Sequence, residues 1–101
     1  MAWVYILKCA DGTYYVGSTV DIEKRIWQHN QGEGAQYTAH RLPVQLVFTA
    51  EYENIADAFH REKQIQGWSR AKREALIQGD YEALPELARK DFSSRKVNRM
   101  K

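Results

Sequence analysis

The chain has 101 residues, of which 44% are hydrophobic and 28% are charged, and its formal net charge is +2. This length suits a single domain with one core, and the composition is ordinary for a soluble globular protein. No apolar run reaches the roughly 18 residues that a membrane span needs, so we expect no transmembrane helix and no membrane partner. The N-terminus has no secretory pattern, and the single cysteine, Cys9, cannot form an internal disulfide, so we expect a reducing, cytoplasmic setting.

The basic residues are distributed unevenly along the chain. Six of the fifteen lie in residues 89–101, together with one acidic residue. Residues 1–88 therefore contain nine basic and twelve acidic residues, which is not a composition that binds DNA by charge alone. We expect one domain over 1–88 and a basic, flexible tail at 89–101. The tail suits sequence-independent contact with phosphates, and a solvated tail without function is the open alternative.

Two β-favouring runs on either side of Asp11-Gly12 predict a hairpin at the start of the chain. The first run carries Tyr5 and the second carries Tyr15, followed closely by Gly17. Taken alone, the tyrosines are better explained by an aromatic core with solvated hydroxyls. A shared site would require both on one face, which happens only if paired residue numbers sum to an even value. For such a site we predict a bulged or odd-length connection at 10–13, or a bulge near Gly17.

The next segment predicts a helix with polar side chains on its apolar face. Asp21 provides the N-cap, and the helix continues to about residue 29 or 30. Arg25 and His29 recur with two isoleucines at helical spacing, so one face carries apolar, cationic and imidazole groups. We expect Arg25 and His29 to face the tyrosines of the hairpin, and an exposed helix face is the alternative.

The second half of the chain predicts one more strand and further helices. A polar loop over 31–43 carries Tyr37 and His40 and is long enough to be functional. The other expected elements are a strand over 44–52 and helices over 55–66 and 70–78. One more short helix is expected within 80–90. Glu62 lies on the apolar stripe of the helix over 55–66, where a carboxylate needs a cation, a metal or a set of donors. A salt bridge and a boundary position that reaches solvent remain as structural alternatives.

The order and spacing of these polar residues resemble the GIY-YIG nuclease superfamily, in particular its small stand-alone bacterial members, which are largely uncharacterised. Trp3-Val4-Tyr5 represents the first signature and Tyr15-Val16-Gly17 the second. Arg25, His29 and Glu62 follow in the family's order, and the resemblance covers about residues 2–78. Two departures stand out: Trp3 replaces the first glycine, and Ser18 stands where many catalytic members carry a lysine.

The resemblance implies a role for each matching residue. Glu62 would bind one Mg²⁺ or Mn²⁺ within reach of Arg25, and Arg25 would hold the scissile phosphate. Tyr5 would be the general base, with its high pKa lowered by the metal and by Arg25. Tyr15 and His29 would assist by hydrogen bonding or proton relay. The residues expected to contact the substrate are Gly17, Ser18, Tyr37 and His40.

Elements and resemblance together predict an α+β fold, with a three-stranded antiparallel sheet flanked by helices. The predicted function is metal-dependent, endonuclease-type hydrolysis of nucleic acid, with DNA expected rather than RNA, by a monomer. Two alternatives from other classes stay open: a nucleic-acid-binding module whose active site has decayed, and a protein-interaction domain that keeps only the fold. Retention of the five polar residues favours the nuclease, whereas Ser18 and the acidic composition of 1–88 favour the nucleic-acid-binding module.

Overall fold

The computed structural model describes residues 1–79, which belong to two compact units, residues 1–66 and the residues from Gly67 onward. The short helix expected within 80–90 and the basic tail at 89–101 lie outside the described residues. The predicted division into a domain over 1–88 and a tail therefore stays a prediction.

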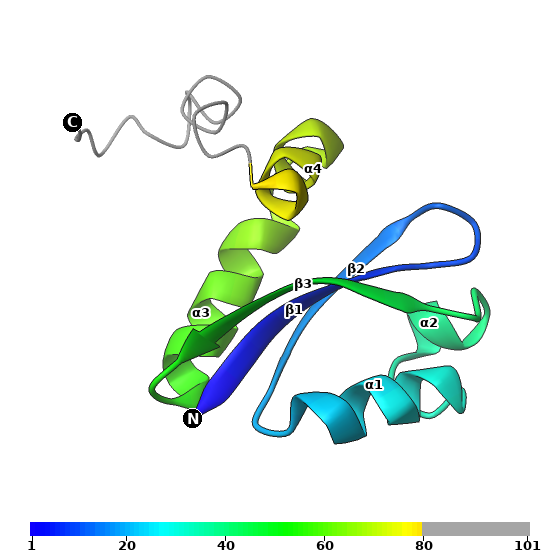
Figure 1. Ribbon diagram of the computed structural model, residues 1–101, viewed down its shortest axis with the longest axis horizontal. Coiled ribbons are helices and arrows are strands. Elements are labelled where there is room, and N and C mark those ends of the chain that lie inside the picture. The colour runs from blue at the N-terminus through cyan, green and yellow to red at the C-terminus, as the bar shows by residue number, and fades with distance from the viewer. Residues whose placement is uncertain (80–101) are drawn as a thin grey trace. The chain divides into compact units, whose positions relative to one another are not determined.

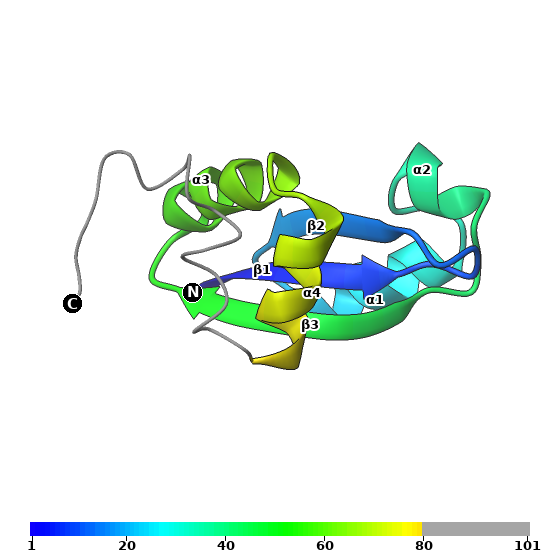
Figure 2. The ribbon, with the colours of Figure 1, turned by 90° about the horizontal axis from the view of Figure 1, so that it is seen from above.

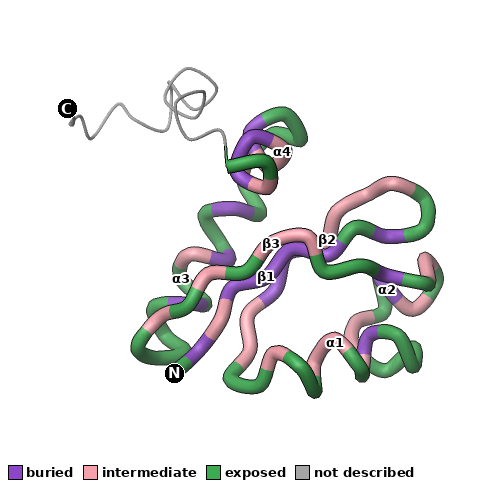
Figure 3. Tube along the Cα trace, viewed as in Figure 1, coloured by how far each residue is buried: buried purple, intermediate pink, exposed green. Residues whose placement is uncertain are grey.

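The first unit is built on a three-stranded antiparallel sheet with the strand order β2-β1-β3 (Figures 1 and 2). β1 (Ala2–Lys8) and β2 (Tyr14–Thr19) form the predicted hairpin, and β3 (Gln45–Tyr52) pairs with the other edge of β1. β1 is the central strand and is almost wholly buried, as the colouring in Figure 3 shows, whereas β2 is an edge strand. Together with the helices described below, this sheet confirms the predicted α+β class.

The hairpin has the even register that a shared site requires. Tyr5 pairs with Gly17, and the residue numbers of every pair in the hairpin sum to 22. The Cys9 amide donates to the Thr13 carbonyl oxygen at 2.8 Å, which closes a three-residue connection. Within it Gly12 has φ +86°, a conformation that glycine adopts without steric strain. The prediction of an odd-length connection is confirmed, and both hairpin tyrosines lie on one face of the sheet.

Helices cover both faces of this sheet (Figures 1 and 2). α1 (Ile22–Asn30) packs on the face that holds the tyrosines, where Tyr5 and Leu7 are buried against it. α3 (Ile55–Gln66) packs on β1 and β2 from the opposite face, and its Ala58 and Ile65 are fully buried. A site at the β2 edge can therefore receive side chains from both layers.

The predicted loop over 31–43 contains one helical turn, α2 (Gln36–Ala39), so the prediction was wrong for these residues. A single turn leaves no hydrophobic periodicity in the sequence, and Ala35 at its N-cap makes no side-chain hydrogen bond. The turn is held by the Thr38 hydroxyl, which donates to the Ala35 carbonyl at 3.0 Å, and by the Arg41 amide, which donates to the Thr38 carbonyl at 2.9 Å.

Local capping chemistry sets the ends of the helices. The Asp21 carboxylate accepts the Lys24 amide at 3.1 Å at the start of α1, as predicted. In the second unit, α4 (Arg70–Gln78) begins after Ser69, whose hydroxyl accepts the Lys72 amide, and ends at Gly79. Within residues 1–79, none of the helices has the length and apolar character to cross a membrane.

Candidate active site

Tyr5 lies at the centre of a buried polar cluster on the α1 face of the sheet. Its side chain is only 1% exposed. Arg25 Nε donates to the Tyr5 hydroxyl oxygen at 3.3 Å, and His29 Nε2 lies 2.9 Å from the same oxygen. Arg25 and His29 are one helical turn apart, so α1 presents both to the sheet. The prediction that these two side chains face the tyrosines is confirmed.

Two glycines leave the room that this cluster occupies. A Cβ atom at Gly17 would lie 2.5 Å from the Tyr5 hydroxyl and 3.1 Å from the Tyr15 ring. A Cβ atom at Gly34 would collide with the His29 imidazole, lying 2.5 Å from its Cγ. Both positions need glycine because a side chain approaches closely, since Gly17 and Gly34 have no positive φ. Contact of Gly17 with substrate stays a prediction.

His29 is fully buried and held at both ring nitrogens. Its Nδ1 lies 2.8 Å from the Thr38 hydroxyl, on the opposite side of the ring from Tyr5. Burial, assisted by the nearby Arg25 charge, lowers the pKa of His29 to about 4, so the imidazole is neutral at pH 7. Thr38, also fully buried, was not predicted as a site residue, and its place in the polar loop was the only indication in the sequence.

Burial also decides the protonation of the two phenols. It raises the pKa of Tyr5 to about 12, because the lowering by the Arg25 hydrogen bond and charge is smaller than the cost of desolvating a phenolate. The pKa of Tyr15 is raised by the same cause, while Arg25 lowers it and Glu62 raises it. Arg25 therefore lowers the pKa of Tyr5, as expected, but in the free protein desolvation raises this pKa by more than Arg25 lowers it.

Tyr15 lies among other rings beside this cluster. Its centroid is 6.4 Å from that of Tyr5, 5.2 Å from that of His29 and 6.2 Å from that of Tyr37. The Tyr15 and Tyr37 rings are nearly parallel, with an interplanar angle of 27°. The aromatic core that the sequence allowed is therefore present, and it surrounds the polar cluster.

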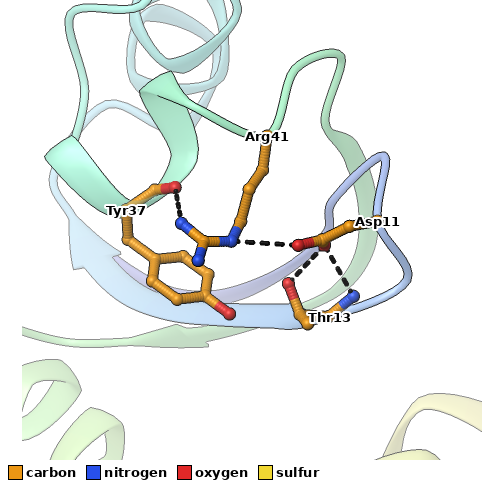
Figure 4. A network of polar contacts seen from close by, with 4 residues as sticks. All are labelled: Asp11, Thr13, Tyr37 and Arg41. Carbon is orange, nitrogen blue, oxygen red and sulfur yellow. Dashed lines mark hydrogen bonds and ion pairs between the residues drawn. The ribbon is translucent and has the colours of Figure 1, made fainter.

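Tyr37 is anchored by a network that ties α2 to the hairpin turn (Figure 4). The Arg41 guanidinium lies 3.9 Å from the Tyr37 ring centroid and donates to the Tyr37 carbonyl at 2.8 Å. Its Nε donates to Asp11 at 3.0 Å, and Asp11 also accepts the hydroxyl and amide of Thr13. Tyr37 remains 39% exposed, and His40 is the C-cap residue of α2. Substrate contact by Tyr37 and His40 stays a prediction.

Glu62 reaches the β2 edge from α3, on the other face of the sheet. The residue is 8% exposed, and its two carboxylate oxygens accept from neutral donors, the Ser18 hydroxyl at 2.6 Å and the Gln66 amide at 2.7 Å. The Lys63 ammonium is 3.9 Å away and half exposed. Within the described part of the chain, no ion pair joins Glu62 to Arg25, and the expectation that the two lie within reach of each other stays a prediction.

Ser18 and Gln66 thus orient the carboxylate. The Ser18 hydroxyl donates to Glu62, and contact of Ser18 with substrate stays a prediction. Gln66 was not predicted, although its spacing of four residues from Glu62 on the helix could have indicated it. Residues 1–79 contain no group of three or more His, Cys, Asp or Glu side chains that could hold a metal.

A single carboxylate still suits Mg²⁺ or Mn²⁺. Mg²⁺ keeps several waters in protein sites and is bound through one or two carboxylates together with substrate phosphates. The charge of Glu62 is met mainly by two neutral donors, and a buried charge without a close counter-charge is costly. The residues present therefore fit a divalent ion that is completed by a phosphate.

An open cleft of about 460 Å³ adjoins the cluster at the start of α1. Arg25, Lys24 and Gln28 line it from the helix, and Ser18 lines it from β2. The guanidinium of Arg25 donates to Tyr5, Gln28 and the Gly34 carbonyl, and it also interacts with the Tyr15 hydroxyl. Arg25 and Lys24 therefore give the cleft two cationic side chains that a ligand can contact.

Comparisons with known proteins agree on one family. The family model described as the GIY-YIG catalytic domain matches residues 1–75. A UPF0213 protein of Halobacterium salinarum is 46% identical over 77 residues, which are 76% of this chain and 100% of the relative. A UPF0213 protein of Staphylococcus saprophyticus is 48% identical over 75 residues, 74% of this chain and 92% of the relative. The solution NMR structure of a UPF0213 protein from Bacillus halodurans is 35% identical, with a TM-score of 0.51, and the match covers 95% of this chain and 100% of that one.

Proposed function

The chain belongs to the GIY-YIG family, and from this premise we propose that it is a metal-dependent endonuclease that hydrolyses phosphodiester bonds, with DNA as its substrate. The family suggests a nuclease-type function, and GIY-YIG nucleases generally use divalent metals. The observation that carries the finer proposal is the buried contact of Arg25, Tyr5 and His29, with Glu62 at the same strand edge. An aromatic core alone would need neither a guanidinium nor a nearly buried carboxylate.

Arg25 is the group that we assign to the scissile phosphate. Its guanidinium lines the cleft and can donate to phosphate oxygens there, while its bonds to Gln28 and Gly34 hold it in place. A guanidinium fixed in this way stabilises negative charge that develops on the phosphate, at no reorganisation cost during the reaction. Lys24 adds a second cation to the same cleft. It partly compensates for the lysine that many catalytic members carry at the position of Ser18.

Glu62 is the group that we assign to the metal. When bound there, Mg²⁺ or Mn²⁺ would supply Lewis-acid charge to the phosphate oxygens. Ser18 and Gln66 keep the two oxygens of Glu62 from rotating, so that the carboxylate is presented in one orientation. Both donors are neutral and the half-exposed Lys63 ammonium is 3.9 Å away, so a cation can still bind to the carboxylate.

Tyr5 can act as a base only after it loses its own proton. Among the described residues, His29 Nε2 is the basic atom within hydrogen-bond distance of its hydroxyl. Transfer breaks the Tyr5 O–H bond, forms an Nε2–H bond, and leaves a phenolate that Arg25 Nε–H continues to bind. The phenolate can then accept a proton from water. The raised pKa of Tyr5 and the lowered pKa of His29 keep both groups neutral in the free protein.

The test is a cleavage and binding assay on plasmid and on single- and double-stranded DNA and RNA oligonucleotides, with Mg²⁺, with Mn²⁺ and with EDTA. The wild type should cleave DNA only with a divalent ion, and Glu62→Gln should lose about 10²-fold or more while keeping its fold and its DNA affinity. Glu51→Gln, at an exposed position on β3, is the matched control and should cleave normally. Binding without cleavage by the wild type would replace this proposal with the binding-module alternative. Cleavage of RNA alone would overturn the choice of DNA.

A further inference from the structure

We propose that Thr38 is a positioning residue that fixes His29 as the tautomer protonated at Nδ1, so that Nε2 is free to accept the proton of Tyr5. This inference rests on the proposed function only for its catalytic consequence. The tautomer itself follows from hydrogen-bond directions in the free protein. The proposal also means that the segment around α2 orients His29, a role other than contact with substrate.

The direction of each bond follows from where protons can go. Arg25 Nε can only donate, so the Tyr5 oxygen accepts from it. The Ala35 carbonyl can only accept, so the Thr38 hydroxyl, 3.0 Å away, donates its single proton there. Thr38 Oγ1 must then accept from His29 Nδ1–H at 2.8 Å. This leaves a lone pair on Nε2, which accepts the Tyr5 O–H at 2.9 Å. Every proton in the chain of bonds has an acceptor.

The opposite tautomer leaves two faults in the same geometry. If Nε2 carried the proton, Nδ1 would need the Thr38 proton, and the Thr38 and Ala35 oxygens would face each other at 3.0 Å with no hydrogen between them. The Tyr5 proton would also have no acceptor among residues 1–79, although this hydroxyl is buried. A buried donor without a partner costs about 1–3 kcal/mol. The geometry therefore favours the Nδ1–H form.

The surroundings of Thr38 hold it in this position. The residue is fully buried and lies on α2. The Arg41 amide and guanidinium bind the carbonyls of Thr38 and Tyr37, and Arg41 is in turn paired with Asp11 on the hairpin turn. Figure 4 shows how the Arg41 side chain joins the two segments. α2 is thus braced against the hairpin, which also carries Tyr5.

The experiment measures the tautomer directly, by ¹⁵N NMR of the histidine ring nitrogens in the metal-free protein. His40→Gln and His60→Gln in the background leave His29 as the single imidazole. In the wild-type Thr38 form, the Nδ1 signal should be that of a protonated ring nitrogen and the Nε2 signal that of an unprotonated one. Thr38→Ser keeps the hydroxyl and should keep this pattern, whereas the isosteric Thr38→Val removes it and should shift His29 toward the Nε2–H form. Cleavage should fall about 10-fold or more in Thr38→Val and recover in Thr38→Ser.

Each outcome separates this inference from the proposed function. An Nε2–H tautomer with Thr38 present would overturn the inference whatever the activity. The same is true if Thr38→Val leaves the Nδ1–H form fully populated. If the tautomer depends on Thr38 as described but no variant cleaves nucleic acid, the proposed function fails and the positioning role stands. Should Thr38→Val not fold, the ring-nitrogen signals of the wild type and of Thr38→Ser still decide the tautomer.

Discussion

Mild acid should destabilise this protein through one imidazole. His29 has a folded-state pKa of about 4, compared with 6.5 for an unperturbed histidine. Between these two values the unfolded chain binds a proton that the folded chain does not, so stability is present above about pH 6.5 and decreases as the pH falls. At about 1.4 kcal/mol per pKa unit, the full loss is about 3 kcal/mol, of which about 2 kcal/mol should be lost by about pH 5.

The assay is urea unfolding, followed by circular dichroism, at several values between about pH 8 and about pH 5. Ending there keeps most carboxylate titrations outside the measured range. His60→Gln, on the exposed face of α3, is the matched control and should lose stability with pH as the wild type does. His29→Gln should be less stable throughout but should lose about 2 kcal/mol less over this range. If His29→Gln shows the same pH dependence as the wild type, the assignment of the lowered pKa to a buried His29 is refuted.

Three further predictions concern close packing, the cleft and the tail. Gly17→Ala should cost about 2–4 kcal/mol in urea unfolding, since its Cβ would lie 2.5 Å from the Tyr5 hydroxyl; an unchanged midpoint would contradict this packing. Lys24→Ala should weaken DNA binding and lower the salt slope by about one unit, as fluorescence anisotropy at several salt concentrations would show, while an unchanged slope would place the phosphate elsewhere. Deleting residues 89–101 should weaken nucleic-acid binding and flatten its salt dependence with the fold unchanged, and equal affinity of both forms across a salt titration would show that the tail is idle.

The parts of this fold that sequence reasoning predicted are those fixed by short-range chemistry. Asp21 and Ser69 cap the helices where their side chains can reach the first free amides. The hairpin register followed from the requirement that Tyr5 and Tyr15 share a face, and Gly12 supplied a turn that allowed it. α1, α3 and α4 begin and end within a residue or two of the predicted bounds for the same reason.

The parts that were missed depend on segments that meet only in the folded chain. Thr38 is nine residues from His29 and lies on α2, a separate helical turn of four residues. No hydrophobic periodicity of the sequence therefore links the two residues. Ser18 and Glu62 are 44 residues apart, so the sequence around Ser18 does not indicate that its hydroxyl donates to Glu62. A sequence shows which charges are available near Tyr5 but not how deeply its phenol is buried, and this burial raises its pKa in the free protein.

The placement of the site on an edge strand makes its two halves separable. The cluster of Tyr5, Arg25 and His29 lies against α1, whereas Glu62 comes from α3 on the other face of the sheet. Under the proposed function, a substitution at Glu62 should therefore abolish cleavage and leave phosphate binding at Arg25 intact, because no hydrogen bond between the described side chains joins Glu62 to Arg25 or His29. Under that proposal, the change from a cleaving to a binding protein needs one replacement at Glu62 and no change of the fold.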